Sequence, residues 1–86
     1  MYYLYIIKCA DKTLYTGITT DLKRRIAEHN STKLGAKYTS SRRPIKLVYS
    51  KKFKNRSIAS KEEARIKKLK RIKKLELIKK NNVFES

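Results

Sequence analysis

Four side chains in the first third of the chain have types that suit hydrolysis of a phosphate ester. They are the phenols of Tyr5 and Tyr15, the guanidinium group of Arg25 and the imidazole of His29. A guanidinium group can donate paired hydrogen bonds to a phosphate, and imidazoles and phenols can transfer protons. If the fold brings these four groups together, they could form a nuclease site.

The sequence predicts a strand, a hairpin, a second strand and a helix that would position these groups. The strands are Tyr2–Cys9 and Thr13–Thr19, and the helix runs to His29 after a cap at Thr20 or Asp21. Both faces of the first strand are apolar, which is typical of a strand that is covered on both sides.

The register of the hairpin decides where the tyrosines point. A two-residue loop would turn Tyr5 and Tyr15 to opposite faces of the sheet, whereas a three-residue loop (residues 10–12) puts them on the same face. We predict the second register, which pairs Tyr5 with Gly17. Gly17 would then leave a gap opposite Tyr5 into which a ligand could come.

The helix carries Arg25 and His29 as i, i+4 neighbours, so both can address one ligand from the same side. They lie at or beside the apolar stripe that Leu22 and Ile26 mark. Taken alone, His29 is better explained as a satisfied histidine at the end of a helix. Arg25 alone could equally be a solvated arginine.

A long polar connection, residues 30–44, follows this helix. It contains basic and aromatic side chains that could grip phosphates or stack on a base, and loops this long are often functional. A flexible, solvated loop is an equally weighted interpretation. The candidate nucleic-acid-binding residues are Lys37, Tyr38, Arg42 and Arg43.

A third strand, Ile45–Phe53, and a helical segment, 57–80, complete the chain. We expect the odd-numbered apolar residues of the strand to share one face: Ile45, Leu47, Tyr49 and Phe53. In the helical segment apolar residues recur every third position, which one straight helix cannot bury on one side. Two helices with a break near Lys70 to Ile72 are therefore predicted, and the first would begin at Ser57 or Ser60.

Glu63 is the acidic residue that stands out in the helical segment, because its carboxylate emerges along the apolar stripe. An unpaired buried carboxylate is costly, so Glu63 should have a cationic partner. The candidates are a metal ion, Arg25, and Lys67 one turn further on. From spacing alone Lys67 is preferred to a metal ion.

The charge of the chain points to a polyanionic partner. There are 24 Lys and Arg residues against 7 Asp and Glu residues, a net charge of +17, and nucleic acid is the simplest polyanion. A lysine-rich surface with no partner ranks second, and an anionic membrane surface third. The 86 residues predict a single domain, 1–86.

The remaining features indicate a protein of the cytoplasm. The apolar N-terminus lacks a basic leader and meets Lys8 early, so neither a signal peptide nor a membrane span is expected. Cys9 is the single cysteine and cannot form an internal disulfide, so it is interpreted as a small buried side chain. No glycine-rich phosphate loop and no zinc-type Cys/His spacing occur in the sequence.

Together these residues resemble the GIY-YIG nuclease domain family, and the resemblance covers nearly the whole chain. It rests on Tyr3-Leu4-Tyr5, Tyr15-Thr16-Gly17, Arg25, His29 and Glu63. The closest similarity is to the short stand-alone bacterial members, through the segments Ala36-Lys37-Tyr38-Thr39 and Arg42-Arg43-Pro44. Two positions differ from the motifs: Tyr3 stands at the glycine of the first, and Thr16 at the middle isoleucine of the second.

The resemblance implies an α+β fold, with a three-stranded antiparallel sheet flanked by helices in the order β-β-α-β-α-α. It implies a metal-dependent endonuclease that hydrolyses DNA phosphodiester bonds with one Mg²⁺ or Mn²⁺ ion. RNA is the less favoured substrate, and no organic cofactor is expected. Carried over by position, Glu63 would bind the metal, and the catalytic residues would be Tyr5, Tyr15, Arg25 and His29.

Some roles stay open at this point. The attacking water would give its proton to a tyrosine such as Tyr5, or to His29 directly or through Tyr5. A second histidine found in some relatives has no counterpart after His29, where Lys37 or Tyr38 falls instead. The chain has no room for a separate DNA-targeting domain, so weak sequence specificity is expected. Strong self-repulsion favours a monomer.

Three functions fit the sequence, and we rank them in order. The first is the nuclease. The second is a non-catalytic nucleic-acid-binding module on the same scaffold, which the net charge supports equally well. The third is a basic structural or ribosome-associated protein, in which the motif residues serve only packing and ion pairing. Convergence of the motif side chains on one site would count against the third.

Overall fold

Three strands form one antiparallel sheet in which β1 lies between the other two. The strands are β1 (Tyr2–Lys8), β2 (Leu14–Thr19) and β3 (Lys46–Phe53), in the order β2-β1-β3. The computed structural model describes residues 1–31 and 43–80. Within them the α+β fold and the antiparallel sheet are as predicted.

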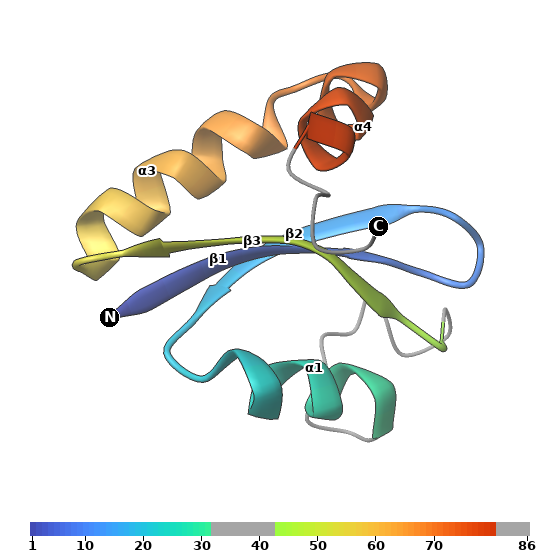
Figure 1. The fold of residues 1–86 in the computed structure, drawn as a ribbon, viewed down its shortest axis with the longest axis horizontal. Helices are drawn as coiled ribbons and strands as arrows, with labels where there is room; N and C mark the ends of the chain where they lie inside the picture. The colour runs from blue at the N-terminus through green and yellow to red at the C-terminus, as the bar shows by residue number, and fades with distance from the viewer. Residues whose placement is uncertain (32–42, 81–86) are drawn as a thin grey trace.

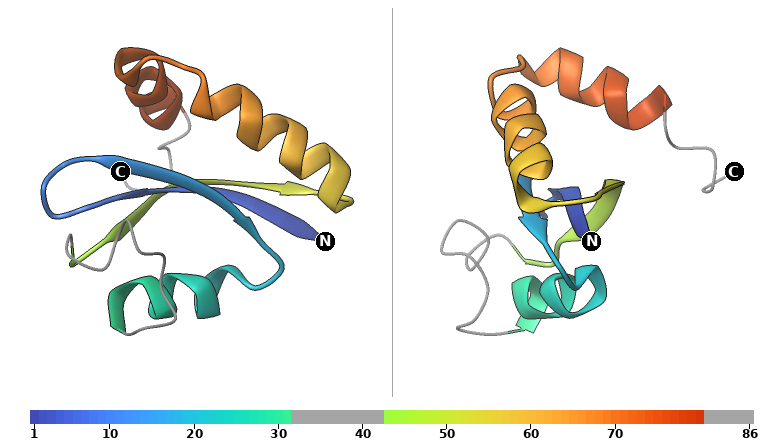
Figure 2. Two further views of the ribbon diagram at one scale, coloured as in Figure 1. Left: turned by 180° about the vertical axis from the view of Figure 1, so that it is seen from behind. Right: turned by 90° about the vertical axis from the view of Figure 1, so that its left-hand side faces the viewer.

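Helices cover both faces of the sheet (Figure 1). α1 (Leu22–Ser31) lies on one face, and α3 (Arg56–Lys67) and α4 (Arg71–Lys80) lie on the other, as the views in Figure 2 also show. No helix in residues 1–31 and 43–80 is long and apolar enough to cross a membrane.

The central strand β1 is buried on both faces, because helices cover it from both sides. Leu4 and Ile6 pack with Ile66 of α3, whereas Tyr5 and Ile7 belong to a second cluster beneath α1. These four side chains, Leu4, Tyr5, Ile6 and Ile7, are at most 1% exposed. The two apolar faces that the sequence showed are therefore two separate halves of the core.

The hairpin has the predicted three-residue loop. The amide of Cys9 donates to the carbonyl of Thr13 at 2.9 Å, and β1 pairs Tyr5 with Gly17 and Ile7 with Tyr15. Lys12 closes the loop with φ of 70°. This register places the side chains of Tyr5 and Tyr15 on the same face, that of α1.

The prediction for the third strand was wrong in one respect. Ile45 and Leu47 pack in the cluster under α1, but Tyr49 and Phe53 pack on the opposite face, against α3 and α4. The cause is a register shift, because Ile6 pairs with Tyr49 while the next residue of β1 pairs with Leu47. The extra residue of β3 at this point changes which face the following side chains take.

The helix ends follow from local capping. Asp21 caps α1, since its Oδ1 accepts from the amide of Arg24 at 3.0 Å. The α3 helix is capped by Asn55, whose Oδ1 accepts from the amide of Ile58 at 3.0 Å, so the predicted start at Ser57 or Ser60 was too late. The predicted break lies between Lys67 and Arg71.

Candidate active site

Tyr5, Tyr15 and His29 form one aromatic cluster between the sheet and α1. The Tyr5 hydroxyl and His29 Nε2 are 3.0 Å apart. The ring of His29 lies edge-on to both tyrosines, with centroid distances of 5.8 Å to Tyr5 and 5.3 Å to Tyr15. The hairpin register and the α1 helix therefore bring together three of the predicted site residues.

The expected gap opposite Tyr5 does not exist, because the Tyr5 ring itself lies over Gly17. A Cβ atom on Gly17 would be 2.6 Å from the Tyr5 hydroxyl oxygen and 2.8 Å from Cζ, which is closer than atoms can approach. The glycine is needed for the position of Tyr5 rather than for that of a ligand. This corrects the interpretation of Gly17 as an opening to the site.

Arg25 lies beside the cluster and bonds to two groups there. Its Nη1 donates to Glu28 Oε1 at 2.9 Å, and the guanidinium group also hydrogen-bonds the Tyr5 hydroxyl. An arginine only donates, so the Tyr5 oxygen accepts from Arg25. The Tyr5 hydroxyl has one proton and two lone pairs, so it donates to Nε2 of His29 or accepts from it, according to the tautomer of His29.

The pKa values of the pair keep both groups neutral near pH 7. Burial raises the pKa of the Tyr5 phenol above 10, and the hydrogen bond from Arg25 opposes this in part. Burial also lowers the pKa of His29 below 6.5, and the positive charge of Arg25 lowers it further. The result is a phenol that holds its proton next to an imidazole that can accept one.

The two tyrosines differ in their exposure to solvent. Tyr5 is 1% exposed and His29 is 0% exposed, whereas Tyr15 is only partly buried. Tyr15 is therefore the phenol at the rim of the cluster, and the Tyr5–His29 pair lies behind it.

Glu63 comes from α3, which contacts β1 and β2 on the face opposite α1. Its Oε2 is 3.4 Å from Nζ of Lys67, and the carboxylate is 23% exposed. The predicted pairing with Lys67 is therefore present, and the suggested pairing with Arg25 is replaced by Arg25–Glu28. The charge of Glu63 still reaches Tyr5, where it adds to the rise in the pKa of the phenol.

The donor set for a metal ion is small. Residues 1–31 and 43–80 contain no group of three or more His, Cys, Asp or Glu side chains that could hold a metal. Mg²⁺ is commonly bound through one or two carboxylates, with water and substrate phosphates as the other ligands. A single partly exposed carboxylate such as Glu63 fits that mode, with the substrate completing the site.

Of the predicted nucleic-acid-binding residues, only Arg43 lies within the described residues. Its Nε donates to the backbone carbonyl of His29 at 3.1 Å, so it supports the end of α1 beside the aromatic cluster. Lys37, Tyr38 and Arg42 lie outside the described residues.

Glu28 is a residue of the site that was not predicted from the sequence. It lies three residues after Arg25 and four after Arg24, and it is close to both, at 2.9 and 3.7 Å. This spacing on a predicted helix is a sufficient signal for such a pair. Glu28 holds the guanidinium group of Arg25 beside Tyr5 and competes with any phosphate that approaches it.

Comparisons with known proteins show the family of the chain. The family model described as the GIY-YIG catalytic domain matches residues 1–76. A UPF0213 protein of Desulfotalea psychrophila is 59% identical over 68 residues, which cover 79% of this chain and 62% of that protein. A UPF0213 protein of Syntrophus aciditrophicus is 56% identical over 67 residues, which cover 78% of this chain and 77% of that protein.

A solved structure has the same fold. It is the solution NMR structure of a UPF0213 protein from Bacillus halodurans, with 40% sequence identity and a TM-score of 0.63. The match covers 96% of this chain and 88% of that one. The name UPF0213 states no activity, so the reaction has to be argued from the site.

Proposed function

Since this chain belongs to the GIY-YIG family, we propose that it is a metal-dependent endonuclease that hydrolyses DNA phosphodiester bonds. The family is one of nucleases, which supports the reaction class. The observation that carries the proposal is the convergence of Tyr5, Tyr15, Arg25 and His29 on one site beside a basic helix. Apolar packing alone would not need a hydrogen bond between a buried phenol and an imidazole with a guanidinium group beside it.

We assign the binding of the scissile phosphate to Arg25. Its fork of donors can hold two phosphoryl oxygens and stabilise the charge that builds up on them in the transition state. In this role the phosphate replaces Glu28 as the hydrogen-bond acceptor for part of the guanidinium group.

Proton transfer is assigned to the aromatic cluster. The partly exposed Tyr15 orients the attacking water, and the attack on phosphorus releases one proton from that water. Neutral His29 is the acceptor, and Tyr5 links to its Nε2 through the 3.0 Å hydrogen bond. A correctly placed base of this kind contributes about 10²- to 10⁴-fold to a rate.

Glu63 is proposed to hold a Mg²⁺ or Mn²⁺ ion together with the substrate phosphate. GIY-YIG nucleases generally use divalent metals. When bound, such an ion stabilises negative charge on the phosphoryl and leaving oxygens. Before binding, Lys67 neutralises the carboxylate.

The test compares two neighbouring glutamates. Supercoiled plasmid, single-stranded DNA and branched DNA are incubated with Mg²⁺ or Mn²⁺ and with wild type, Glu63→Gln or Glu62→Gln, all purified identically. We expect cleavage by wild type and Glu62→Gln, its loss in Glu63→Gln, and its loss with a chelator. Glu62 is the matched control because its carboxylate bonds to Arg65 on the same helix. Equal cutting by Glu63→Gln would show that the metal ligand is misassigned.

The second candidate is a DNA-binding module that does not cut. The Glu63–Lys67 pair favours it, because a carboxylate already neutralised by a lysine need not bind a metal. Salt-sensitive binding with no cleavage of any DNA form at either metal would support this function over the first.

A further inference from the structure

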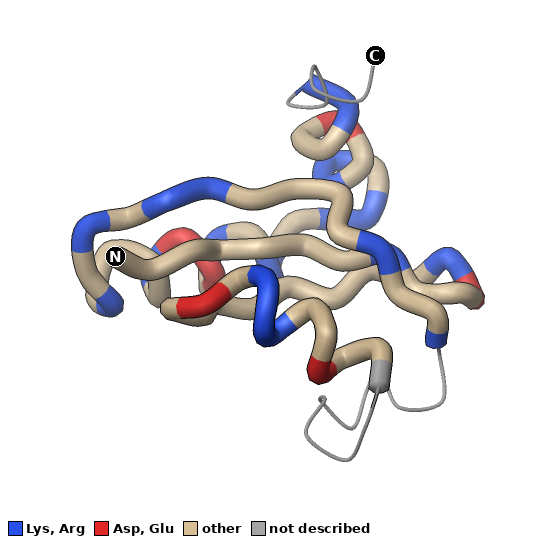
Figure 3. Tube along the Cα trace, turned by 60° about the horizontal axis from the view of Figure 1, so that its bottom comes forward, with Lys and Arg blue, Asp and Glu red and all other residues tan. Residues whose placement is uncertain are grey.

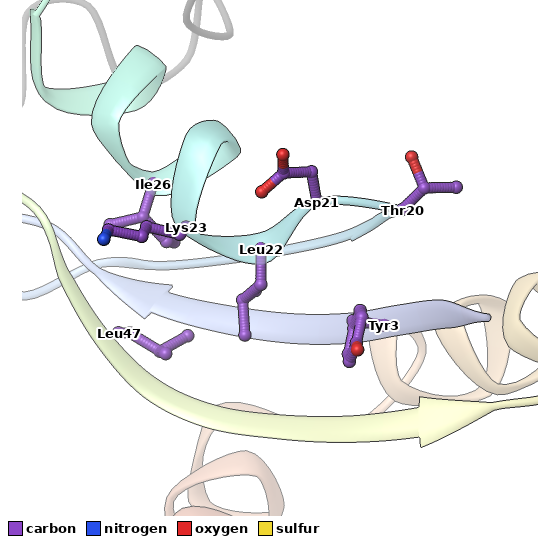
Figure 4. Close-up of a pocket in the computed structure, with 7 residues that line it drawn as sticks. All are labelled: Tyr3, Thr20, Asp21, Leu22, Lys23, Ile26 and Leu47. Atoms are coloured by element: carbon purple, nitrogen blue, oxygen red, sulfur yellow. The ribbon is translucent and has the colours of Figure 1, made fainter.

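A second feature lies on the α1 face of the sheet, beyond the aromatic cluster. It is an open cavity of about 600 Å³ at the start of α1. Figure 4 shows side chains from β1, the start of α1 and β3 around it. Those used below are Tyr3, Asp21, Leu22, Lys23, Ile26 and Leu47.

The cavity is one step along β1 from the proposed catalytic centre. Tyr3 and Tyr5 are alternate residues of β1 and so point to the same face. The rise along a strand separates them by about 7 Å, which is within the reach of one nucleotide. A nucleic-acid strand whose phosphate lies at Arg25 would therefore bring a neighbouring nucleotide to Tyr3.

The walls of the cavity suit the flat face of a nucleobase. Leu22 and Ile26 of α1 and Leu47 of β3 line the cavity with apolar side chains, and the Tyr3 ring of β1 lines it as well (Figure 4). Bases stack on aromatic rings regardless of sequence. Tyr3 stands where the GIY-YIG motif has glycine, so this chain has a ring at a position where the motif has no side chain.

The polar side chains around the cavity favour a base over a phosphate as its ligand. Lys23 lines the cavity, and Lys52 Nζ lies 6.0 Å from the centre of the Tyr3 ring, so cations flank the opening. Asp21 lines it as well, and a carboxylate repels phosphates but accepts from the amino group of a base. One of its oxygens caps α1, and a carboxylate has capacity to accept further bonds.

We propose that this cavity binds an unpaired or extruded base next to the scissile phosphate, stacked on Tyr3 and held at its amino edge by Asp21. The proposal deepens the proposed nuclease function and rests on it for the position of the phosphate. It names the substrate class: DNA with an unpaired base beside the cut, with cytosine preferred to thymine because only cytosine offers an exocyclic amino group.

The test measures binding rather than cleavage, so that it does not depend on catalysis. Proteins with Glu63→Gln are titrated against fluorescent duplexes that are fully paired or carry one bulged cytosine, thymine or abasic nucleotide. The background protein should bind the cytosine bulge at least about fivefold more tightly than the paired or abasic duplex. It should bind the thymine bulge more weakly than the cytosine bulge.

Four further variants in that background assign the effect to residues. Tyr3→Leu should remove the preference for a base and leave abasic binding unchanged, whereas Tyr3→Phe should retain it. Asp21→Ser keeps a good helix cap but shortens the side chain, so cytosine and thymine should bind alike. Tyr2→Leu, which removes a ring from the opposite face of β1, should behave like the background protein.

Equal binding of base-containing and abasic bulges would overturn the proposal, as would a full preference in Tyr3→Leu. If Tyr3→Leu does not fold, the abasic duplex and Asp21→Ser decide the matter in the same way. Failure of the nuclease function is separable, because wild type would then cut nothing while the base preference persisted. Cleavage without any base preference in binding would contradict the cavity proposal but not the nuclease function.

Discussion

At the residue scale, the site depends on how Arg25 orders the hydrogen bonds around Tyr5. Because arginine can only donate, the Tyr5 oxygen accepts from Arg25, and the same hydroxyl is also hydrogen-bonded to Nε2 of His29 at 3.0 Å. Burial, and after it the positive charge of Arg25, holds the pKa of His29 below 6.5. Arg25 therefore bonds the Tyr5 phenol and adds to the effect of burial that keeps His29 neutral at neutral pH.

This lowered pKa makes a prediction about stability. The unfolded chain protonates its histidine near pH 6.5, whereas the folded chain resists protonation until a lower pH. The stability that neutral His29 contributes is therefore present above pH 6.5 and lost as the pH falls from there through the folded-state pKa. Urea unfolding between pH 8 and 5 should show this decline.

His29 is the only histidine in the chain, which gives a clean control. In His29→Gln the free energy of unfolding should be lower at pH 8, because a buried hydrogen bond is disturbed at a cost of about 1–3 kcal/mol. The variant should also lose the decline in stability that begins near pH 6.5. The same pH dependence in both proteins would mean that another group is responsible.

Glu28 limits how strongly Arg25 can bind a phosphate. Glu28→Gln removes the competing carboxylate, so binding of a DNA oligonucleotide at low salt should become tighter. The gain should be up to about fivefold, because partly exposed ion pairs are worth roughly 0.2–1 kcal/mol. Glu76→Gln is the matched control, since Glu76 pairs with Lys73 on α4. Weaker binding in Glu28→Gln would mean that Glu28 chiefly positions Arg25.

At the element scale, the hairpin works only with glycine opposite Tyr5. Gly17→Ala would place a methyl group against the Tyr5 ring, so it should lower stability by about 1–3 kcal/mol and displace the hydroxyl from His29. In a Tyr5→Leu background the same change should cost much less, because the contact is gone. Urea unfolding of the four proteins measures this coupling. Additive costs would show that the ring yields without strain.

Much of this arrangement was predictable, because local rules set it. The three-residue loop is the one of the two registers that puts Tyr5 and Tyr15 on the same face, and the break before Arg71 follows from apolar residues at every third position. The Glu63–Lys67 pair follows from i, i+4 spacing. In each case the signal lies within a few residues of the feature.

The features that were predicted wrongly, or not predicted, depend on contacts between elements. The shift in β3 depends on its pairing with Ile6 and Ile7, which no pattern within the strand shows. That the Tyr5 ring covers Gly17 depends on χ angles fixed by His29 on another element. The cavity at Tyr3 needs β1, α1 and β3 at once. Sequence periodicity specifies which side of an element faces inward but not what it meets there.

At the scale of the whole molecule, the positive charge has to be placed relative to the site. Figure 3 shows Lys and Arg on α1, on β3 and on α4, with few acidic positions between them. Arg25 and Lys23 of α1 and Lys52 of β3 lie at the site or the cavity, whereas α4 lies on the opposite face of the sheet. A duplex engaged at Arg25 should therefore contact the first set and not the second.

The salt dependence of binding tests whether DNA contacts the α1 face and not the opposite face. If about six phosphates are neutralised, raising the salt from about 50 to 200 mM should weaken DNA binding by Glu63→Gln about 10³-fold. In that background Lys52→Gln should reduce the slope of log K against log salt by about one, since one phosphate contact is lost. Lys74→Gln on α4 removes the same charge from the far face and should leave the slope unchanged. Equal effects of the two substitutions would mean that net charge, and not a path across the α1 face, governs binding, and Arg25 would then lose its place as the centre of the interface.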